Sequence, residues 1–236
     1  MKRILFCLLA TLLTAQATPE VEITAEPHHH LTFENKSVRV FNVEVPPNEA
    51  TEIHWHRHDY IAITLGAAEI VNTVKDKPPV TVKFADGDTR FAAATFAHFV
   101  RTTSPAPFRN VTIELLEDAT LRNATSPWDP AKNEDRGLET FPGGTKQILF
   151  VKDAIRASEF ELQPGAKAPM PASACLIVAV NDLKLQAADL PRNAPNNAWQ
   201  SIRQESGGSE WLPGGYVHAV TNIGTKAAKF VTLEFP

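Results

Sequence analysis

The chain has 236 residues and a formal net charge of −4 at neutral pH, from 23 lysines and arginines against 27 aspartates and glutamates. The basic residues are scattered rather than clustered, which argues against nucleic acid and against an acidic membrane surface as partners. The chain has two cysteines. Because Cys7 lies in a leader segment, Cys175 is the one cysteine of the remaining chain, and we expect it to be buried, inert and free of any internal disulfide.

The first seventeen residues have the order that is typical of a secretory signal. Lys2 and Arg3 precede an apolar run, and Ala15 and Ala17 supply the small residues of a cleavage site. The run is about half of the roughly 20 residues that span a bilayer. We therefore expect residues 1–17 to be removed. The mature chain of 236 − 17 = 219 residues, with a charge near −4 − 2 = −6, would then be exported as a soluble protein, secreted or periplasmic.

The mature sequence predicts an all-β protein. Short segments rich in Val, Ile, Phe and Thr are separated by Pro, Gly, Asn and Asp, and no window of eleven or more residues shows a clean helical period. The segments are "SVRVFNVEV", "HDYIAITL", "VTVKF", "NVTIELL", "CLIVAV" and "AKFVTLEF". This pattern is typical of a sandwich or barrel. Residues 120–145, which are rich in Pro, Gly and charges, predict a linker that packs through Trp128 and Phe141.

Two halves of the chain repeat each other at low identity. A shift of 117 places Phe33 on Phe150, Val38 on Ile155, Arg39 on Arg156 and Pro47 on Pro164. A shift of 120 places Gly87 on Gly207, His98 on His218, Val111 on Val231, Thr112 on Thr232 and Glu114 on Glu234. The repeat predicts two strand-rich units joined by the linker. The recurrence of Glu114 and Glu234 indicates a structural role for both carboxylates.

The stretch "IHWHRHDY" places three histidines within five positions. Side chains alternate along a strand, so one face would carry Glu52, His54, His56, His58 and Tyr60. Two imidazoles two positions apart on a strand can reach one metal ion, and a third from another strand would complete a facial set. The alternative is a polar strand face covered by solvent.

The repeat indicates that the second unit lacks this cluster. Under the shift of 117, the three histidines fall on Pro171, Ser173 and Cys175. His98 alone has a histidine counterpart, His218, which we interpret as a relic. The run His28 to His30, just before the first strand, is interpreted as a surface feature.

These residues resemble the cupin superfamily, whose members are small jelly-roll barrels. The second unit matches the second cupin motif at Gly207, Pro213, Gly215, His218 and Asn222. The first unit keeps Gly87 and His98 of that motif, but Ala93, Thr95 and Thr102 replace its Pro, Gly and Asn. For the first cupin motif, His54 and His56 supply His-x-His, and Asn48 stands in place of a glycine.

The resemblance implies a bicupin made of two tandem jelly-roll barrels. The barrels would span residues 28–119 and 146–236, with the linker at 120–145 between them. It also implies one divalent transition metal in the first barrel, on His54, His56 and His98. The metal could be Fe, Mn, Cu, Ni or Zn, because spacing does not choose among them. The carboxylate ligand of the cupin pattern is absent, since its place falls on Tyr60 or Ile61.

Two classes of function follow from this interpretation. In the first, the protein is an exported metal-dependent enzyme acting on a small oxygenated substrate, dioxygenase-like or isomerase-like. Tyr60, His58 and Glu52 would then assist proton transfer. In the second, it is a non-catalytic bicupin that binds a small ligand or metal. Under both hypotheses we expect a small-molecule partner and no nucleic acid or membrane, and cupin barrels often pair as homodimers.

Overall fold

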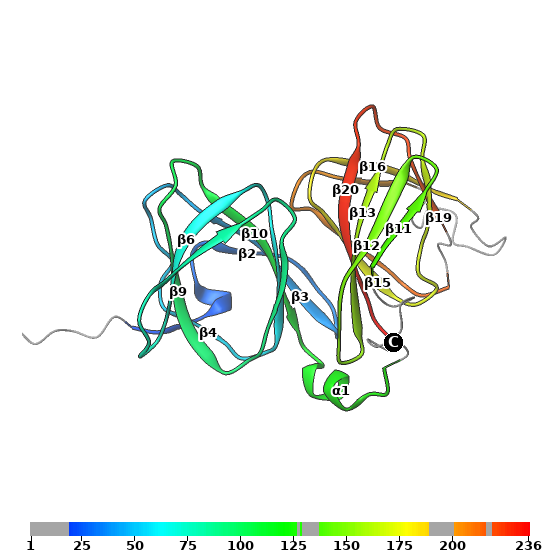
Figure 1. Cartoon of the computed structure of the whole chain (residues 1–236). Helices are drawn as coiled ribbons and strands as arrows, with labels where there is room; N and C mark the ends of the chain where they lie inside the picture. The colour runs from blue at the N-terminus through cyan, green and yellow to red at the C-terminus, as the bar shows by residue number, and fades with distance from the viewer. Residues whose placement is uncertain (1–18, 127, 129–136, 189–200, 216–218) are drawn as a thin grey trace, which may run out of the picture.

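A computed structural model describes residues 19–126, 128, 137–188, 201–215 and 219–236. Two β-barrels lie side by side and are joined by the short helix α1 (Asp118–Asn123) (Figure 1). The expected all-β fold of two tandem jelly-roll barrels is confirmed. Within these ranges, no helix is long and apolar enough to cross a membrane. The leader of residues 1–17 and His218 lie outside the described residues.

The first barrel consists of two five-stranded sheets, ordered β1-β4-β9-β6-β7 and β2-β3-β10-β5-β8. Its elements are β1 (Val21–Glu22), η1 (Ile23–Ala25), β2 (His29–Glu34), β3 (Val38–Val45), β4 (His54–His56), β5 (Tyr60–Thr64), β6 (Ala68–Val74), β7 (Val80–Phe84), β8 (Thr89–Ala92), β9 (Phe96–Thr102) and β10 (Phe108–Leu115). All pairings are antiparallel except that of β1 with β4, which is parallel.

The second barrel repeats most of this topology with strand numbers raised by ten, in the orders β11-β12-β13-β20-β15-β18 and β14-β19-β16-β17. The exceptions are β1, which pairs with β4, and β11, which pairs with β12 at the edge of the other sheet. The strands of the second barrel are β11 (Gly137–Phe141), β12 (Gly144–Lys152), β13 (Ile155–Leu162), β14 (Lys167–Pro169), β15 (Cys175–Ala179), β16 (Leu183–Ala188), β17 (Ser201–Gln204), β18 (Ser209–Leu212), β19 (Ala219–Asn222) and β20 (Ala228–Glu234). Strand β11 lies inside the segment 120–145 that the sequence predicts as a linker, and β1 precedes the expected start at residue 28.

The backbone reproduces much of the predicted repeat. Strands β2 and β12 each carry a register shift in their pairing with β3 and β13, just before Phe33 in one barrel and Phe150 in the other. Asn48 and Gly165, which the shift of 117 equates, both have a positive φ, of 63° and 80°. Left-handed backbone is cheap for glycine and tolerated by asparagine. This explains why Asn48 stands in the place of a glycine.

One part of the predicted register is wrong. Strand β10 pairs Glu114 with Tyr60, and β20 pairs Glu234 with Cys175. Cys175 is therefore the counterpart of Tyr60 rather than of His58. The connection into β15 is two residues shorter than the one into β5, so the shift falls from 117 to 115 there. As expected, Cys175 is buried, and burial raises the pKa of its thiol to about 12.

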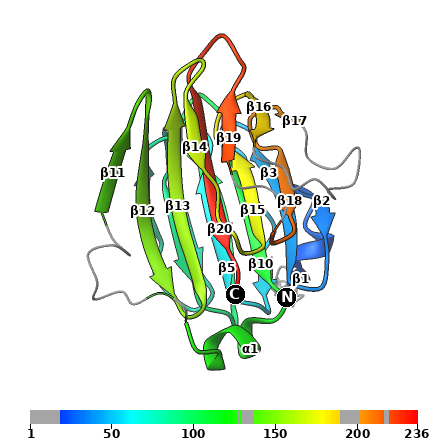
Figure 2. The same ribbon diagram turned by 90° about the vertical axis from the view of Figure 1, so that its right-hand side faces the viewer.

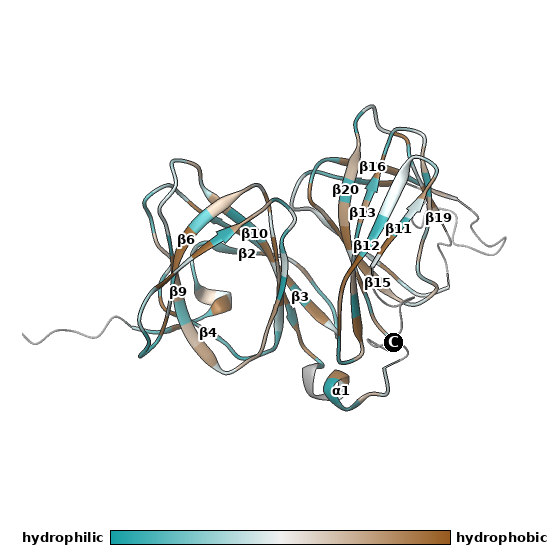
Figure 3. Cartoon of the chain, viewed as in Figure 1, coloured by the Kyte–Doolittle hydropathy of each residue, from teal (hydrophilic) through white to brown (hydrophobic). Residues whose placement is uncertain are grey.

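The two barrels share a hydrophobic core between them. The sheet containing β3, β10 and β5 packs against the sheet containing β13, β20 and β15, as the side view shows (Figure 2). The first barrel contributes Val38, Val40, Ile61, Ile63, Val111 and Ile113, and the second contributes Ala157, Leu176, Val178, Val231 and Leu233. Alternating side chains of these strands point into this shared core, and the side chains between them point into a barrel. Figure 3 shows hydrophobic positions, in brown, along strands of both barrels.

The repeated glutamates have a structural role, as the sequence predicted. Arg39 donates to Glu114 at 3.2 Å, and Arg156 donates to Glu234 through two nitrogens at 3.0 and 2.7 Å. Both carboxylates are buried, and the two arginines are themselves equivalent in the repeat. A buried carboxylate needs such a partner because desolvation of an unpaired charge is costly.

Candidate metal centre

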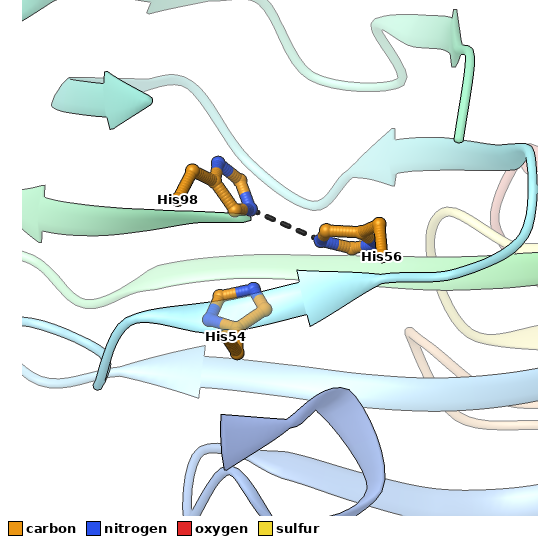
Figure 4. A group of neighbouring side chains, drawn as sticks. All are labelled: His54, His56 and His98. Carbon is orange, nitrogen blue, oxygen red and sulfur yellow. Dashed lines mark hydrogen bonds between the residues drawn. The ribbon is translucent and has the colours of Figure 1, made fainter. Parts of the chain in front are cut away.

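Three histidines from two paired strands meet inside the first barrel. His54 and His56 lie on β4, and His98 lies opposite His54 on β9. All three side chains are buried. The alternation of β4 points both of its histidines inward and leaves Trp55 on the outside, where its indole donates to Glu20. Figure 4 shows the three rings converging, with a hydrogen bond between His56 and His98.

The spacing of the nitrogens suits a single metal ion. One ligand atom from each histidine lies within 4.8 Å of the other two, and the Nε2 atoms of His56 and His98 are 3.0 Å apart. Two nitrogens bound at about 2.1 Å and at right angles to each other would be about 3.0 Å apart. The observed separation therefore fits two ligands of one ion as well as it fits a hydrogen bond.

Two of the rings are held in the orientation that a metal ligand requires. Nδ1 of His54 donates to the carbonyl oxygen of Glu52 at 2.9 Å, and Nδ1 of His98 donates to Oδ1 of Asn72 at 2.7 Å. These contacts leave the lone pair on Nε2. Among the described residues, Nε2 of His54 is buried without a hydrogen-bond partner. A divalent ion would satisfy this atom, so the donor set fits one.

The protonation state is also the one that metal binding needs. Burial, followed by the neighbouring His29, lowers the pKa of His54 to about 4. Burial and the adjacent histidines hold the pKa of His56 and of His98 well below the usual value. All three imidazoles are therefore neutral near pH 7 and present lone pairs.

The histidines line a cavity of about 230 Å³ inside the barrel. Its walls are mainly apolar, and they are formed in part by Val43, Val45, Ile70, Val82, Phe84, Val100 and Phe108. The polar groups on the wall are His29, Thr51, Tyr60, Asn72, Arg90, Asn110 and Thr112, besides the three histidines. A largely apolar cavity with a few convergent polar groups is typical of a small-molecule site.

Tyr60 and Arg90 are the polar wall residues with the most evident chemical use. The ring of Tyr60 stacks on His56 with centroids 4.0 Å apart, and burial raises the pKa of its phenol above the usual value. The phenol therefore remains a hydrogen-bond donor. Arg90 is half exposed, and its guanidinium lies over the ring of Phe84 at 4.3 Å. One of its nitrogens lies 3.3 Å from a carboxylate oxygen of Asp88, whereas the described residues of the cavity wall include no carboxylate.

The structure separates the residues that the sequence placed on one face. His54, His56 and His98 come together, and Tyr60 stands beside them. The expected continuous face is wrong at His58, because β4 ends at His56 and β5 begins at Tyr60 in the other sheet. His58 lies in the connection and Glu52 is exposed, and neither is among the residues that line the cavity. Glu52 meets the site only through its backbone carbonyl.

Three residues of the site were not predicted from the sequence. Asn72 orients His98, Arg90 lines the wall, and His29 packs against His54 with ring centroids 4.6 Å apart. The surface interpretation of residues 28–30 is wrong for His29, whose side chain is 5% exposed. The sequence alone does not indicate that His29 is buried. Its burial follows from its contact with the buried carboxylate of Glu26, which only the structure reveals.

Comparison with known proteins supports the fold and leaves the activity open. The sequence matches no protein-family model, and no curated protein is similar to it at a significant level. Among solved structures, oxalate decarboxylase from Bacillus subtilis, a protein with Mn(II) centres, aligns with a TM-score of 0.59 at 11% identity. That alignment covers 91% of this chain and 76% of the other.

AerE from Microcystis aeruginosa is a second similar structure. It aligns with a TM-score of 0.55 at 13% identity, over 89% of this chain and 98% of its own. At these identities the likeness establishes the fold alone. The chain therefore has the cupin-type jelly-roll fold in two copies.

Proposed function

We propose that the first barrel binds one divalent transition-metal ion through His54, His56 and His98, and that the protein is a metal-dependent enzyme acting on a small oxygenated substrate. The observation that carries the proposal is the convergence of three buried, neutral imidazoles on a cavity of about 230 Å³. A metal ion alone would fill a small part of that space. Three protein ligands also leave coordination positions open for another molecule.

A metal ion bound there would polarise a substrate oxygen, and iron or copper would in addition support chemistry with O2. The chain itself supplies the surroundings. The apolar walls exclude water from the substrate, which strengthens every polar contact inside the cavity. The phenol of Tyr60 stays protonated, because burial raises its pKa, and so is available to donate a hydrogen bond to a substrate oxygen. Arg90 attracts an anionic or strongly polarised oxygen of the substrate.

We place an oxygenase-like reaction first and an isomerase-like reaction second. Both need a substrate oxygen beside the metal and a neutral donor such as Tyr60 to stabilise developing charge. The fold of oxalate decarboxylase, which holds Mn(II), accommodates metal chemistry on a small oxygen-rich molecule and adds manganese to the metals worth testing. Iron, copper, nickel and zinc are equally compatible with three imidazoles.

The alternative is a non-catalytic protein that binds a small ligand or a metal. One observation favours it. Neither Glu52 nor His58, the two residues expected beside Tyr60 to move protons, is among the residues that line the cavity. An enzyme of the proposed kind would then depend on Tyr60, on His29 or on groups of the substrate itself.

We also propose that the protein is exported. The charged, apolar and small-residue order of residues 1–17 supports this. Mass spectrometry of the protein purified from its native host is expected to show a chain that begins at Thr18. A full-length chain that retains Met1 would contradict export by cleavage.

The metal proposal is tested by elemental mass spectrometry on protein purified without a histidine tag, with His54→Ala and His98→Ala prepared in parallel. We expect about one transition-metal ion per chain in the unaltered protein and a large loss in both variants. The identity of the metal then selects the assay. Oxygen uptake with enols, phenols and diketones would follow for iron or copper, and isomerisation of hydroxycarbonyl compounds for zinc or manganese. A protein that takes up no metal, even after reconstitution, would refute the proposal.

A further inference from the structure

The segment that precedes β2 runs beside the strand that carries His54 and His56. Strand β1 pairs with β4 in parallel, with Val21 opposite His54. The 3-10 turn η1 follows, and Glu26 comes directly after it with a side chain that is fully buried. This short segment therefore brings a carboxylate into the interior of the first barrel.

Glu26 accepts hydrogen bonds on both carboxylate oxygens. Oε1 accepts the backbone N–H of Glu52 at 3.1 Å and contacts Nδ1 of His28 at 3.0 Å. Oε2 accepts the backbone N–H of His28 at 2.8 Å and contacts Nδ1 of His29 at 2.5 Å. Burial by itself would raise the pKa of Glu26, but the hydrogen bonds from His29 and His28 outweigh burial and lower the pKa to about 2. The carboxylate is ionised.

Two of these contacts lead to His54. The Glu52 residue that donates its N–H to Glu26 also accepts the Nδ1 proton of His54 on its carbonyl oxygen. His29, which binds the other carboxylate oxygen, packs its ring against the His54 ring at 4.6 Å. Glu26 thus fixes, on two sides, the groups that set the position of His54.

Glu26 also differs from the other buried carboxylates among the described residues. Asp59 pairs with Arg122, Glu114 with Arg39 and Glu234 with Arg156, so each of these three charges is balanced by a permanent cation. Within the described residues, the carboxylate of Glu26 instead contacts the Nδ1 atoms of His28 and His29, whose charge depends on protonation. The negative charge of Glu26 is therefore not cancelled by a lysine or an arginine.

The carboxylate of Glu26 is one residue removed from the metal site, because both His29 and Glu52 contact His54 directly. Neutral imidazoles contribute no negative charge, and a divalent ion in a buried, low-dielectric cavity is stabilised strongly by a nearby anion. Groups that hold metal-binding histidines from behind typically change metal affinity 10- to 100-fold when they are altered. We expect a change of the same size in metal affinity when the carboxylate of Glu26 is altered, because it holds a metal-binding histidine in place and carries a negative charge.

We infer that Glu26 is a positioning residue of the metal centre, which holds His54 through His29 and the Glu52 backbone and supplies the negative charge that the three histidines lack. This inference rests on the proposed function of the first barrel. The segment before β2 then has a role in metal binding. Glu26, which does not line the cavity, supplies the negative charge that the described residues of the cavity wall lack.

The test is the affinity of the metal-free, full-length mature chain for Zn²⁺ and for Mn²⁺, measured by competition with a chromophoric chelator. Glu26→Gln is expected to raise the Kd for each ion about tenfold or more, because glutamine keeps the size and the acceptor oxygen but removes the charge. Circular dichroism and thermal unfolding of the metal-free forms establish that the variant is folded.

Two controls separate the role of Glu26 from general effects of a lost carboxylate. Glu234→Gln removes a buried carboxylate in the second barrel, and Glu49→Gln removes an exposed one that lies 3.6 Å from His28. Both are expected to bind metal as the unaltered chain does. A Kd for Glu26→Gln within twofold of the unaltered value would overturn the inference, as would an equal weakening in all three variants.

A second variant keeps the inference testable if Glu26→Gln does not fold. His29→Gln retains an N–H donor for Glu26 but removes the ring that packs against His54, so a smaller, severalfold rise in Kd is expected. An unchanged Kd for His29→Gln would then overturn the inference. Failure of the unaltered chain to bind either ion, or any other transition metal, would instead overturn the proposed function.

Discussion

The two barrels have the same strand order, apart from β1 and β11, but their interiors are filled differently. In the second barrel, Phe160 and Phe230 stack with ring centroids 5.0 Å apart at the centre of an apolar core. In the first, the position equivalent to Phe230 is Asn110, which lines the cavity. Ala62 of the first barrel likewise corresponds to Ile177 of the second. At these inward positions the second barrel has large apolar side chains where the first has small or polar ones, which is consistent with a packed core in one and a cavity in the other.

The outward faces of the same strands, in contrast, are similar in the two barrels. Val111 and Val231, which are equivalent in the repeat, are both fully buried in the shared core between the barrels. The two barrels therefore differ in their interiors but contribute alike to this interface. We interpret the second barrel as a rigid partner that covers the apolar sheet of the first. The comparison predicts that stability is concentrated in one barrel and binding in the other.

The largest expected effect comes from matched substitutions at the equivalent pair. Phe230→Ala is expected to lower the free energy of unfolding by about 3–5 kcal/mol, because it opens a cavity in a filled core. Asn110→Ala is expected to cost about 1 kcal/mol, the value of its hydrogen bond from Thr112. Urea unfolding followed by tryptophan fluorescence measures both. Equal losses would show that the two interiors do not differ as described.

The second effect is a loss of stability of the metal-free protein at acidic pH. A histidine whose pKa is lowered in the folded state binds fewer protons folded than unfolded, so its contribution is complete above the unfolded pKa and is lost as pH falls. For His54 the pKa falls from 6.5 to about 4. This predicts a loss on the order of 3 kcal/mol between pH 6.5 and 4. His56 and His98 add to the loss in the same direction.

Urea midpoints at several pH values between 7 and 4 check this prediction. The His54→Ala variant is the control, and its stability is expected to fall less steeply over the same range. Saturating metal is expected to flatten the dependence until the ligands are protonated. Parallel curves for the variant and the unaltered protein would contradict the burial of a neutral His54.

A smaller effect on metal affinity tests the hydrogen bond that orients the ring of His98. The partner that orients His98 is Asn72, and the equivalent position in the second barrel is Ala187. Asn72→Ala is expected to weaken metal binding about tenfold, or about 1.4 kcal/mol. Asn72→Asp keeps an acceptor oxygen for Nδ1 and is expected to bind at least as tightly as the unaltered chain. Chelator competition measures both, and equal affinities for the alanine and aspartate variants would contradict the role of Asn72.

The smallest effect compares two turns that have glycine in the second barrel. Thr95 has φ 71° where Gly215 has φ 83°, and Asn48 has φ 63° where Gly165 has φ 80°. A β-branched residue is strained in this region, whereas asparagine is tolerated. Thr95→Gly is expected to stabilise the fold by about 1 kcal/mol, and Asn48→Gly to change it by a few tenths. Thermal unfolding decides, and a lower Tm for Thr95→Gly would contradict the strain at Thr95.

The sequence predicted the structure best where two patterns agreed, namely the internal repeat of the two halves and the alternation of side chains along a strand. The repeat of Glu114 at Glu234 indicated a structural role for both carboxylates, and the structure shows each of them paired with one of the repeated arginines, Arg39 and Arg156. His98 was found only because His218 marks its place in the better preserved motif. The metal triad and the jelly-roll fold could thus be proposed from local spacing and from register.

The rest depends on contacts that local spacing does not encode. The break between His56 and Tyr60 moves the chain from one sheet to the other, which alternation within a single strand cannot reveal. Asn72 and Arg90 reach the cavity through pairings with β9 and β5 respectively. The role of Glu26 requires the parallel pairing of β1 with β4, a contact between segments about thirty residues apart.

The most direct test of the account is to locate the metal by anomalous X-ray diffraction from crystals of the metal-loaded, tag-free mature protein. We predict one strong anomalous peak per chain, in the first barrel, about 2.0–2.3 Å from nitrogens of His54, His56 and His98, and no comparable peak in the second barrel. A peak bound elsewhere, or a first barrel without metal in protein saturated with it, would contradict the division of the chain into a binding barrel and a packed one.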